Sequence, residues 1–335
     1  MERSQRLPMA LNAFGLPHVM GYLPTQAGEK PAAPLGRIGL MDAAVEMGLA
    51  GIEAPIPAGD PDALRATGAA LQERDLQLVA PLSVLIDRDL AEIRAYLEGA
   101  AALGAKVVRA MLSSVLCGDR RRLEGGWEQR LARSATLLRE ILPIAHDLGL
   151  AIAIENHQDA TSADLLQLQE RVDHHPAYGV TLDTGNPLAV GEDPVAFARR
   201  VAPLIRHVHL KDYTIHFAPE GYRLVRCIAG TGVIDFPSIL AIVRENGHNV
   251  LPGVEVAAQQ TRTIPLLEDD WWSHYPPEQA THLPAALRVL WEKGRPQDEP
   301  YSSAWERGGD SATICTEEWA VVRGSVAYFH RLAAA

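Results

Sequence analysis

The amino-acid sequence predicts an α/β protein, a (β/α)₈ TIM barrel followed by a C-terminal extension. Short apolar runs alternate with amphipathic stretches of helical length through most of the chain, which is typical of βα units around a parallel sheet. Four of the later runs end in a carboxylate or an imidazole. An interior strand would not tolerate such an end unless it opened into a polar site, as strands do at the mouth of a barrel.

The expected strands and helices follow one another in alternation. Strands are expected at residues 9–14, 51–54, 76–80, 107–111, 152–156, 179–183, 205–210 and 253–256. Helices are expected at residues 36–47, 60–74, 88–103, 127–148, 162–173, 193–201 and 237–245. Gly48, Gly104, Gly149 and Gly247 stand where helices should end, because glycine readily adopts the left-handed conformation that terminates a helix.

Two stretches are longer than a plain βα connection. Residues 113–126 follow the fourth strand, and residues 213–232, rich in proline and glycine, follow the seventh. Both come after the C-terminal end of a strand, where barrels carry substrate-binding loops, so we expect loops there. We place the barrel domain at residues 1–258 and the extension at 259–335, with helices at 284–293 and 316–332 packed on the same domain.

Composition restricts the class of protein. Acidic side chains outnumber basic ones, 42 against 31, and the net charge of −11 is poorly suited to binding nucleic acid or a membrane surface. Three separated cysteines indicate neither a disulfide framework nor a cysteine metal site. With no signal peptide or membrane-length apolar segment in the sequence, we expect a cytoplasmic protein.

Glu155, Asp183, His209 and Glu255 end the fifth to eighth expected strands. In a barrel these strands are neighbours and their C-terminal ends converge on one mouth. Three carboxylates so close together would repel one another without a cation. The ligand set suits one divalent metal, Mn²⁺ first, with Mg²⁺, Co²⁺ or Zn²⁺ as alternatives.

The phrases around these residues resemble those of a known family. They are Ile154-Glu155-Asn156-His157, Leu182-Asp183-Thr184-Gly185-Asn186, Val208-His209-Leu210-Lys211-Asp212 and Gly230-Thr231-Gly232-Val233-Ile234-Asp235-Phe236, with Glu255 closing the set. In this order they resemble the xylose-isomerase-like superfamily of TIM barrels, the sugar phosphate isomerase/epimerase group. The resemblance covers roughly residues 9–258 and leaves the final segment outside it.

The resemblance implies a divalent metal held by Glu155, Asp183, His209 and Glu255. It also implies that the two glutamates act as catalytic acid and base on opposite faces of a sugar, in an isomerase or epimerase that works through an enediolate. Ketose 3-epimerases of the group carry a substrate-binding histidine where this chain has Asn186. A neutral amide can bind a sugar oxygen but cannot carry a proton in the same way.

His157 is the residue that can compensate for Asn186. It lies two residues beyond Glu155 and therefore on the same side of an extended chain. It is expected either to act as a catalytic acid or base near the metal or to orient Glu155, and the sequence does not separate these roles.

Four further charged residues are candidates for substrate binding. Lys211 can neutralise a substrate oxyanion or form a salt bridge with Asp183. Glu53 and Arg109 can contact sugar hydroxyls or pair with each other in the mouth. Arg226 can reach a substrate oxygen or be a solvated loop arginine. The aromatic residues Trp271, Trp272, His274 and Tyr275 either form a wall over the mouth or, as we favour, pack the tail against the barrel or a second subunit.

Two alternatives to the isomerase or epimerase stay open. One is a lyase of the C-glycoside deglycosidase or dehydratase type, which would eliminate a β-substituent from a 3-oxo-sugar; Asn186, His157 and the aromatic tail favour it. The other is a non-catalytic barrel subunit. The substrate is expected to be a small sugar or glycoside, and the assembly a homo-oligomer, or a hetero-oligomer with a smaller subunit for a deglycosidase.

Overall fold

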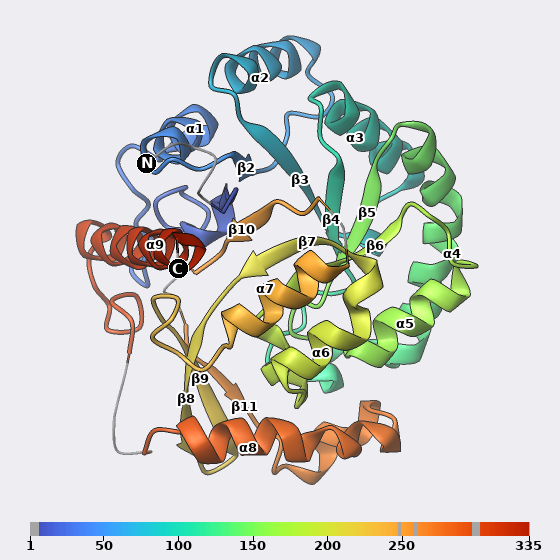
Figure 1. The fold of residues 1–335 in the computed structure, drawn as a ribbon, viewed down its shortest axis with the longest axis vertical. Helices are drawn as coiled ribbons and strands as arrows, with labels where there is room; N and C mark the ends of the chain where they lie inside the picture. Colours follow the sequence, from blue (N-terminus) through green and yellow to red (C-terminus); the bar gives the residue numbers. More distant parts are fainter. Residues whose placement is uncertain (1–6, 247–248, 257–259, 297–301, 335) are drawn as a thin grey trace.

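The computed structural model describes residues 7–246, 249–256, 260–296 and 302–334. Its centre is a closed barrel of parallel strands in the order β1-β10-β7-β6-β5-β4-β3-β2, drawn in Figure 1. The strands are β1 (Ala10–Asn12), β2 (Gly51–Glu53), β3 (Gln77–Val84), β4 (Val107–Met111), β5 (Ala151–Glu155), β6 (Tyr178–Asp183), β7 (Ile205–Leu210) and β10 (Pro252–Val254). The predicted (β/α)₈ barrel is confirmed, and each expected strand is present within a few residues of its expected place.

Seven helices alternate with the barrel strands and surround them (Figure 1). They are α1 (Gly36–Glu46), α2 (Pro61–Glu73), α3 (Leu90–Ala102), α4 (Gly126–Asp147), α5 (Ser162–Arg171), α6 (Pro194–Val201) and α7 (Phe236–Glu245). Thr161 begins α5 with a capping box, in which its side chain and that of Asp164 each bond the other's backbone N–H. Gly104 and Gly149 end their helices at positive φ, as expected, whereas Gly247 lies outside the described residues.

The stretch after β7 differs from the loop that we expected. It forms a hairpin of β8 (Tyr213–Ala218) and β9 (Gly221–Arg226), to which β11 (Arg262–Ile264) adds an antiparallel third strand. The turn residues around Gly221 made the stretch look like a loop, but they lie between two runs that alternate at period two. One face of this small sheet buries apolar side chains, and this burial stabilises strands where turn residues alone predict a loop.

The C-terminal extension contains α8 (Leu283–Lys293) and α9 (Ser311–Ala334), which are the two expected helices, the second starting and ending slightly further out. Helix α8 lies beside β8, and α9 lies beside β10 (Figure 1). Phe329 of α9 is fully buried and meets the ring of Phe236 edge to face, 4.8 Å between centroids. The expected domain boundary at residue 258 lies outside the described residues.

The aromatic segment of the extension packs against the loop between β4 and α4. Trp271 is fully buried and its indole N–H donates to the carbonyl of Cys117, 3.2 Å away. Tyr275 donates its hydroxyl to the carbonyl of Gly118 at 2.7 Å. The buried guanidinium of Arg120 lies 4.0 Å from the ring centroids of both Trp127 and Tyr275. These contacts agree with the interpretation that the aromatic segment packs the C-terminal tail against the barrel.

Within the described part of the chain, no helix is long and apolar enough to cross a membrane.

Candidate active site

The four expected metal ligands meet at the C-terminal mouth of the barrel. Glu155 and Asp183 end β5 and β6, His209 lies next to the end of β7, and Glu255 directly follows β10. The register pairs Asp183 with His209 across neighbouring strands. One ligand atom from each of the four residues lies within 4.8 Å of the others. The sequence therefore named four residues that the fold brings together.

Three of the four residues have a ligand atom without a hydrogen-bond partner among the described residues. Among the described residues, Asp183 Oδ2, Glu255 Oε2 and His209 Nδ1 are buried and form no hydrogen bond. His209 Nδ1 nevertheless lies 3.0 Å from Glu255 Oε2 and 3.3 Å from Glu155 Oε1. Buried polar atoms are ordinarily satisfied, and a shared cation would satisfy all of these at once. The residues present therefore fit a divalent metal.

Lys211 pairs with two of the ligands. Its Nζ lies 2.6 Å from Asp183 Oδ2 and 3.1 Å from Glu255 Oε2, so the salt bridge considered from the sequence is formed. These are close charge pairs that lack the geometry of a hydrogen bond. The other oxygen of Asp183 accepts the backbone N–H groups of Gly185 and Asn186 at 2.9 and 3.0 Å, which fixes the direction of the carboxylate.

The charges around the ligands influence one another strongly. Burial opposes ionisation of Glu155, but the positive charges of His209 and Arg109 outweigh it and lower its pKa to about 2. Glu255 is less completely buried, with 15% of its side chain exposed, and Lys211 and His209 hold its pKa well below the usual range. For Asp183 burial prevails and raises the pKa in spite of Lys211. Glu155 and Glu255 are thus carboxylates at neutral pH.

Glu53 lies on the other side of His209 from the candidate ligands. Its Oε2 atom accepts hydrogen bonds from Nε2 of His209 at 2.8 Å, from Nε2 of His207 at 3.0 Å and from the side-chain amide of Asn12 at 2.9 Å. Its Oε1 atom accepts Nε of Arg109 at 3.0 Å. The structure therefore pairs Glu53 with Arg109, the alternative to substrate contact, and Glu53 turns Nδ1 of His209 toward the other three ligands.

His157 and Asn186 are both near the ligands with one nitrogen unused. Nδ1 of His157 and Nδ2 of Asn186 are buried without hydrogen-bond partners in the described residues. Burial lowers the pKa of His157 to about 4 although Glu155 opposes this, so the imidazole is neutral at physiological pH. The Asn186 side chain is held from the other end by the hydroxyl of Tyr213, 3.4 Å from its Oδ1.

Arg226 is not a solvated loop arginine, because it is the last residue of β9 and is only partly exposed. It faces the site closely enough that Tyr213, Glu255 and Asp183 raise its pKa in spite of burial. Sequence reasoning missed Tyr213 and Arg262, which lie on the same small sheet. The period-two alternation of residues 213–226 was the signal that could have found this sheet.

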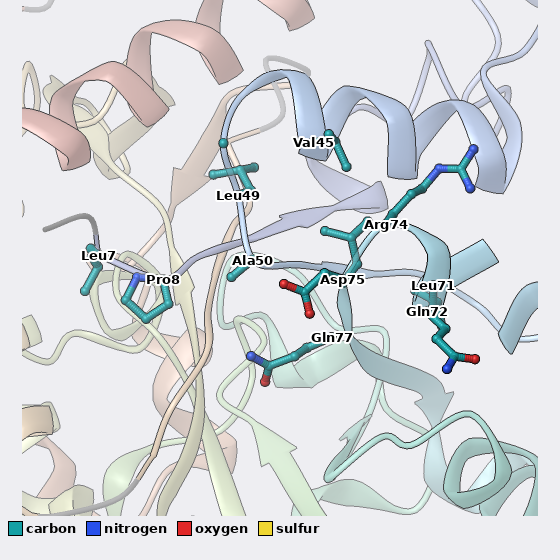
Figure 2. A pocket seen from close by; sticks show the side chains of 12 residues that line it. Leu7, Pro8, Val45, Leu49, Ala50, Leu71, Gln72, Arg74, Asp75 and Gln77 are labelled. Atoms are coloured by element: carbon teal, nitrogen blue, oxygen red, sulfur yellow. The ribbon is translucent and has the colours of Figure 1, made fainter. Parts of the chain in front are cut away.

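A separate pocket lies at the opposite end of the barrel. Figure 2 shows it beside the N-terminal starts of β2 and β3, with Leu49, Ala50 and Gln77 among its walls. In a TIM barrel this end serves stability, whereas active sites occupy the C-terminal face. We therefore look for chemistry at the mouth.

Comparison with protein families agrees with the architecture. The model of the xylose isomerase-like TIM barrel family matches residues 41–281. A 3-oxo-isoapionate decarboxylase of Pectobacterium atrosepticum is 27% identical over 264 residues, which are 74% of this chain and 89% of that protein. An inosose dehydratase of Lacticaseibacillus casei is 26% identical over 189 residues, 49% of this chain and 62% of its own.

Solved structures share the fold at low identity. A xylose isomerase-like TIM barrel protein of Mycobacterium smegmatis in complex with magnesium superposes with a TM-score of 0.58 at 17% identity, over 87% of this chain and 98% of that one. The IolI protein with a bound zinc atom gives 0.56 at 17% identity, over 85% and 99%. A D-allulose 3-epimerase of Methylomonas sp. gives 0.54 at 18% identity, over 86% and 97%.

Proposed function

Because this chain belongs to the xylose isomerase-like TIM barrel family, we propose that it is a divalent-metal-dependent sugar isomerase or epimerase that removes a proton next to a carbonyl group. The observation that carries the proposal is the convergence of Glu155, Asp183, His209 and Glu255, three of which have a buried ligand atom that forms no hydrogen bond with the described residues. Such a set would be costly to keep buried for packing alone.

These four residues would hold the metal. When bound, the cation would stabilise the negative charge that develops on a substrate oxygen as the neighbouring carbon loses its proton. Glu155 and Glu255 approach the same nitrogen of His209 from different strands. Both carry depressed pKa values, so either can accept a proton from one face of the carbon, and the other, after taking a proton from solvent, would donate it to the opposite face and invert the carbon.

His157 and Asn186 would act on the substrate beside this centre. Neutral His157 has a free ring nitrogen that can take up a proton, and it can return the proton to the adjacent carbon. The free amide N–H of Asn186 can donate to a carbonyl or hydroxyl oxygen. Lys211 supports the same oxygen electrostatically from its place between Asp183 and Glu255.

A lyase is the second candidate. Asn186 replaces the histidine that the similar ketose 3-epimerases carry, and two of the similar proteins are a decarboxylase and a dehydratase. Proton loss and decarboxylation both leave an electron pair on the carbon next to a carbonyl, and the same pair can then expel a β-substituent. The same charged residues would therefore serve each reaction, and the substrate's own leaving group would decide among them.

Metal binding and isotope exchange test the proposal together. We would titrate chelator-treated protein with Mn²⁺, Mg²⁺, Co²⁺ and Zn²⁺ by calorimetry. We would then incubate it in D₂O with ketoses, inososes, 3-oxo-glycosides and 3-oxo-aldonates, and follow deuterium, released aglycone and CO₂ by NMR. We expect metal-dependent deuterium incorporation that Glu155→Gln abolishes and the exposed α5 control Glu170→Gln retains.

Each outcome has a distinct meaning. Incorporation without bond cleavage supports the isomerase or epimerase, whereas loss of aglycone, water or CO₂ supports the lyase. A protein that binds no divalent cation and exchanges no proton would refute both enzymes and favour the non-catalytic subunit.

A further inference from the structure

The small sheet formed by β8, β9 and β11 has one face turned toward the barrel mouth. In the register, Tyr213 pairs with Arg226, and Leu224 pairs with both Ile215 and Arg262. Directly paired residues share a face, and every second residue of a strand returns to it. This inner face therefore carries Tyr213, Ile215, Tyr222, Leu224, Ile264, Arg226 and Arg262.

The inner face is buried against the barrel. Ile215, Leu224 and Ile264 on this face are at most 1% exposed, whereas Phe217, which pairs with Tyr222 at the far end of the hairpin, is 39% exposed. Tyr222 donates its hydroxyl to the carbonyl of Leu188, and Tyr213 reaches Asn186 beside the candidate ligands. Two arginines on such a face are unusual, because buried cations are normally paired.

The two arginines are neighbours at the end of the face closest to the active site. Arg226 lies opposite Tyr213, and Tyr213 follows Lys211 by only two residues in the sequence. Arg262 lies opposite Leu224 and hence diagonal to Arg226, a separation of about 7 Å between side-chain origins. Both guanidinium groups therefore point to one region between the sheet and the mouth.

Arg262 has few partners of its own. It is 9% exposed, it donates to the neutral amide oxygen of Gln260 at 3.1 Å, and its Nε is buried without a partner in the described residues. Burial and the charge of Arg226 lower its pKa. Glu306 is nearby, but one of its oxygens accepts hydrogen bonds from Thr261 and the other accepts one from the backbone N–H of Ser303.

Asp183 and Glu255 of the candidate metal centre interact with Arg226, but in a count of formal charges the centre does not balance both arginines once a divalent cation is bound. Glu53 is paired with Arg109, and Lys211 with the proposed divalent cation compensates Glu155, Asp183 and Glu255. With the cation bound, the part of the mouth next to the β8–β9 hairpin thus has a surplus of positive charge. A planar guanidinium pair suits an anion with several oxygens, since each group can donate two hydrogen bonds.

We propose that Arg226 and Arg262 bind an oxyanion of the substrate, a carboxylate or a phosphate, so that the enzyme acts on an anionic sugar derivative in preference to a neutral sugar. The proposal rests on the proposed function, because it places the rest of this substrate at the same metal centre. The anion would lie against the inner face of the sheet, and the carbon chain would extend toward Glu255 and His157.

Three six-carbon probes separate the possibilities. We would measure binding of D-gluconate, D-glucitol 6-phosphate and neutral D-glucitol to the Mn²⁺-loaded protein by calorimetry. We expect one of the two anions to bind at least about tenfold more tightly than glucitol, and Arg262→Gln to reduce that preference roughly ten- to hundredfold. The matched control is Arg223→Gln on the opposite face of β9, which should keep the preference. The better anion identifies carboxylate or phosphate.

The results also distinguish this proposal from the previous one. If cations bind but all three probes bind alike, or Arg262→Gln keeps the preference, the anion site is refuted and the metal-dependent enzyme stands. If no cation binds but the arginine-dependent preference for an anion remains, the anion site stands and the metal-dependent enzyme is refuted. Should Arg262→Gln not fold, Arg262→Lys, which keeps the charge but loses the planar fork, should show a smaller loss of preference in the same direction, and an unchanged preference would overturn the assignment.

Discussion

Two groups of acidic and histidine side chains share His209, and they differ in how their polar atoms are used. The upper group comprises Glu155, Asp183, Glu255 and Nδ1 of His209; the lower group comprises Glu53, His207 and Nε2 of His209. By residue type either could hold a metal ion. In the lower group both oxygens of Glu53 accept hydrogen bonds, whereas the upper group leaves three buried ligand atoms without one in the described residues.

The comparison teaches that residue type does not distinguish a metal site from the network that supports it. Hydrogen bonding does, because a satisfied carboxylate gains little from a cation while an unsatisfied one gains much. We therefore propose that the lower group positions His209 and that the upper group binds a metal ion. Each of the following predictions tests this difference between the two groups.

The largest effect is expected from Asp183→Asn. The amide oxygen can still accept hydrogen bonds from Gly185 and Asn186, but the amide nitrogen would replace Oδ2, which forms no hydrogen bond with the described residues, with a donor that repels a cation. We expect divalent-metal affinity to fall by more than the roughly 100-fold that marks the upper end for supporting residues. Calorimetry measures it, with the exposed Asp147→Asn as control. Unchanged affinity would remove the upper group as the metal site.

Glu53→Gln tests the lower group. Loss of its charge leaves Arg109 and His209 without their shared carboxylate, so we expect roughly 10- to 100-fold weaker metal binding and about 3–5 kcal/mol lower stability. Calorimetry and urea denaturation measure the two effects. His207→Gln is the matched control, because it removes a hydrogen bond to Glu53 but leaves the charge of Glu53 and its bond to His209 in place. A metal affinity that changes equally in both variants would contradict the positioning role of Glu53.

The upper group and the barrel could be predicted from the sequence because both are expressed locally. Each ligand ends an apolar run, and closure of a barrel brings consecutive strand ends together whatever the side chains between them. The roles of Glu53 and Arg109 could not be predicted in the same way. Glu53 meets His209 across 156 residues, and only the strand order and register decide whether it faces the substrate or the underside of a ligand.

The hairpin shows a second limit of sequence reasoning. Proline and glycine near residue 220 favour a loop, and the burial that turns the flanking runs into strands comes from their contacts with the barrel. Arg262 was missed for a related reason, since its strand has only three residues and pairs with β9 from a distant part of the chain. Short strands are specified by their partners more than by their own periodicity.

Arg120→Met sharpens the comparison with a buried ion that is satisfied and distant from the metal. Arg120 pairs with Asp164, donates to the carbonyl of Asp159 and lies between two aromatic rings. We expect about 3 kcal/mol lower stability, at the low end for a broken buried pair because Thr161 still donates to Asp164. Metal affinity should not change. The exposed neighbour Arg122→Met is the control, and a loss of metal binding in Arg120→Met would mean that satisfied networks also govern the site.

Glu318 of α9 provides a test of whether nearby positive charge, rather than hydrogen bonding alone, keeps a buried carboxylate ionised. Like Glu53 it accepts several donors, the backbone N–H groups of His18 and Val19 at 3.0 to 3.1 Å, but it has no salt-bridge partner among the described residues. Burial raises its pKa to about 7, whereas the pKa of buried Glu53 is lowered by His209 and Arg109. Arg226 also lowers the pKa of Glu318 but does not outweigh its burial, so the difference in sign follows from how strongly nearby cations act on each carboxylate.

The stability of the protein should therefore depend on pH through Glu318. The folded carboxyl holds its proton more tightly than the unfolded one, so its contribution is complete below the unfolded pKa near 4.5 and is lost as pH rises through 7. Relative to Glu318→Gln, the wild type should lose up to about 3 kcal/mol between pH 4.5 and 8 in urea denaturation. The exposed Glu292→Gln on α8 should show no such trend against the wild type. A stability difference that stays constant with pH would mean that backbone donors alone can keep a buried carboxylate ionised, and the contrast between Glu318 and Glu53 would then not depend on cations.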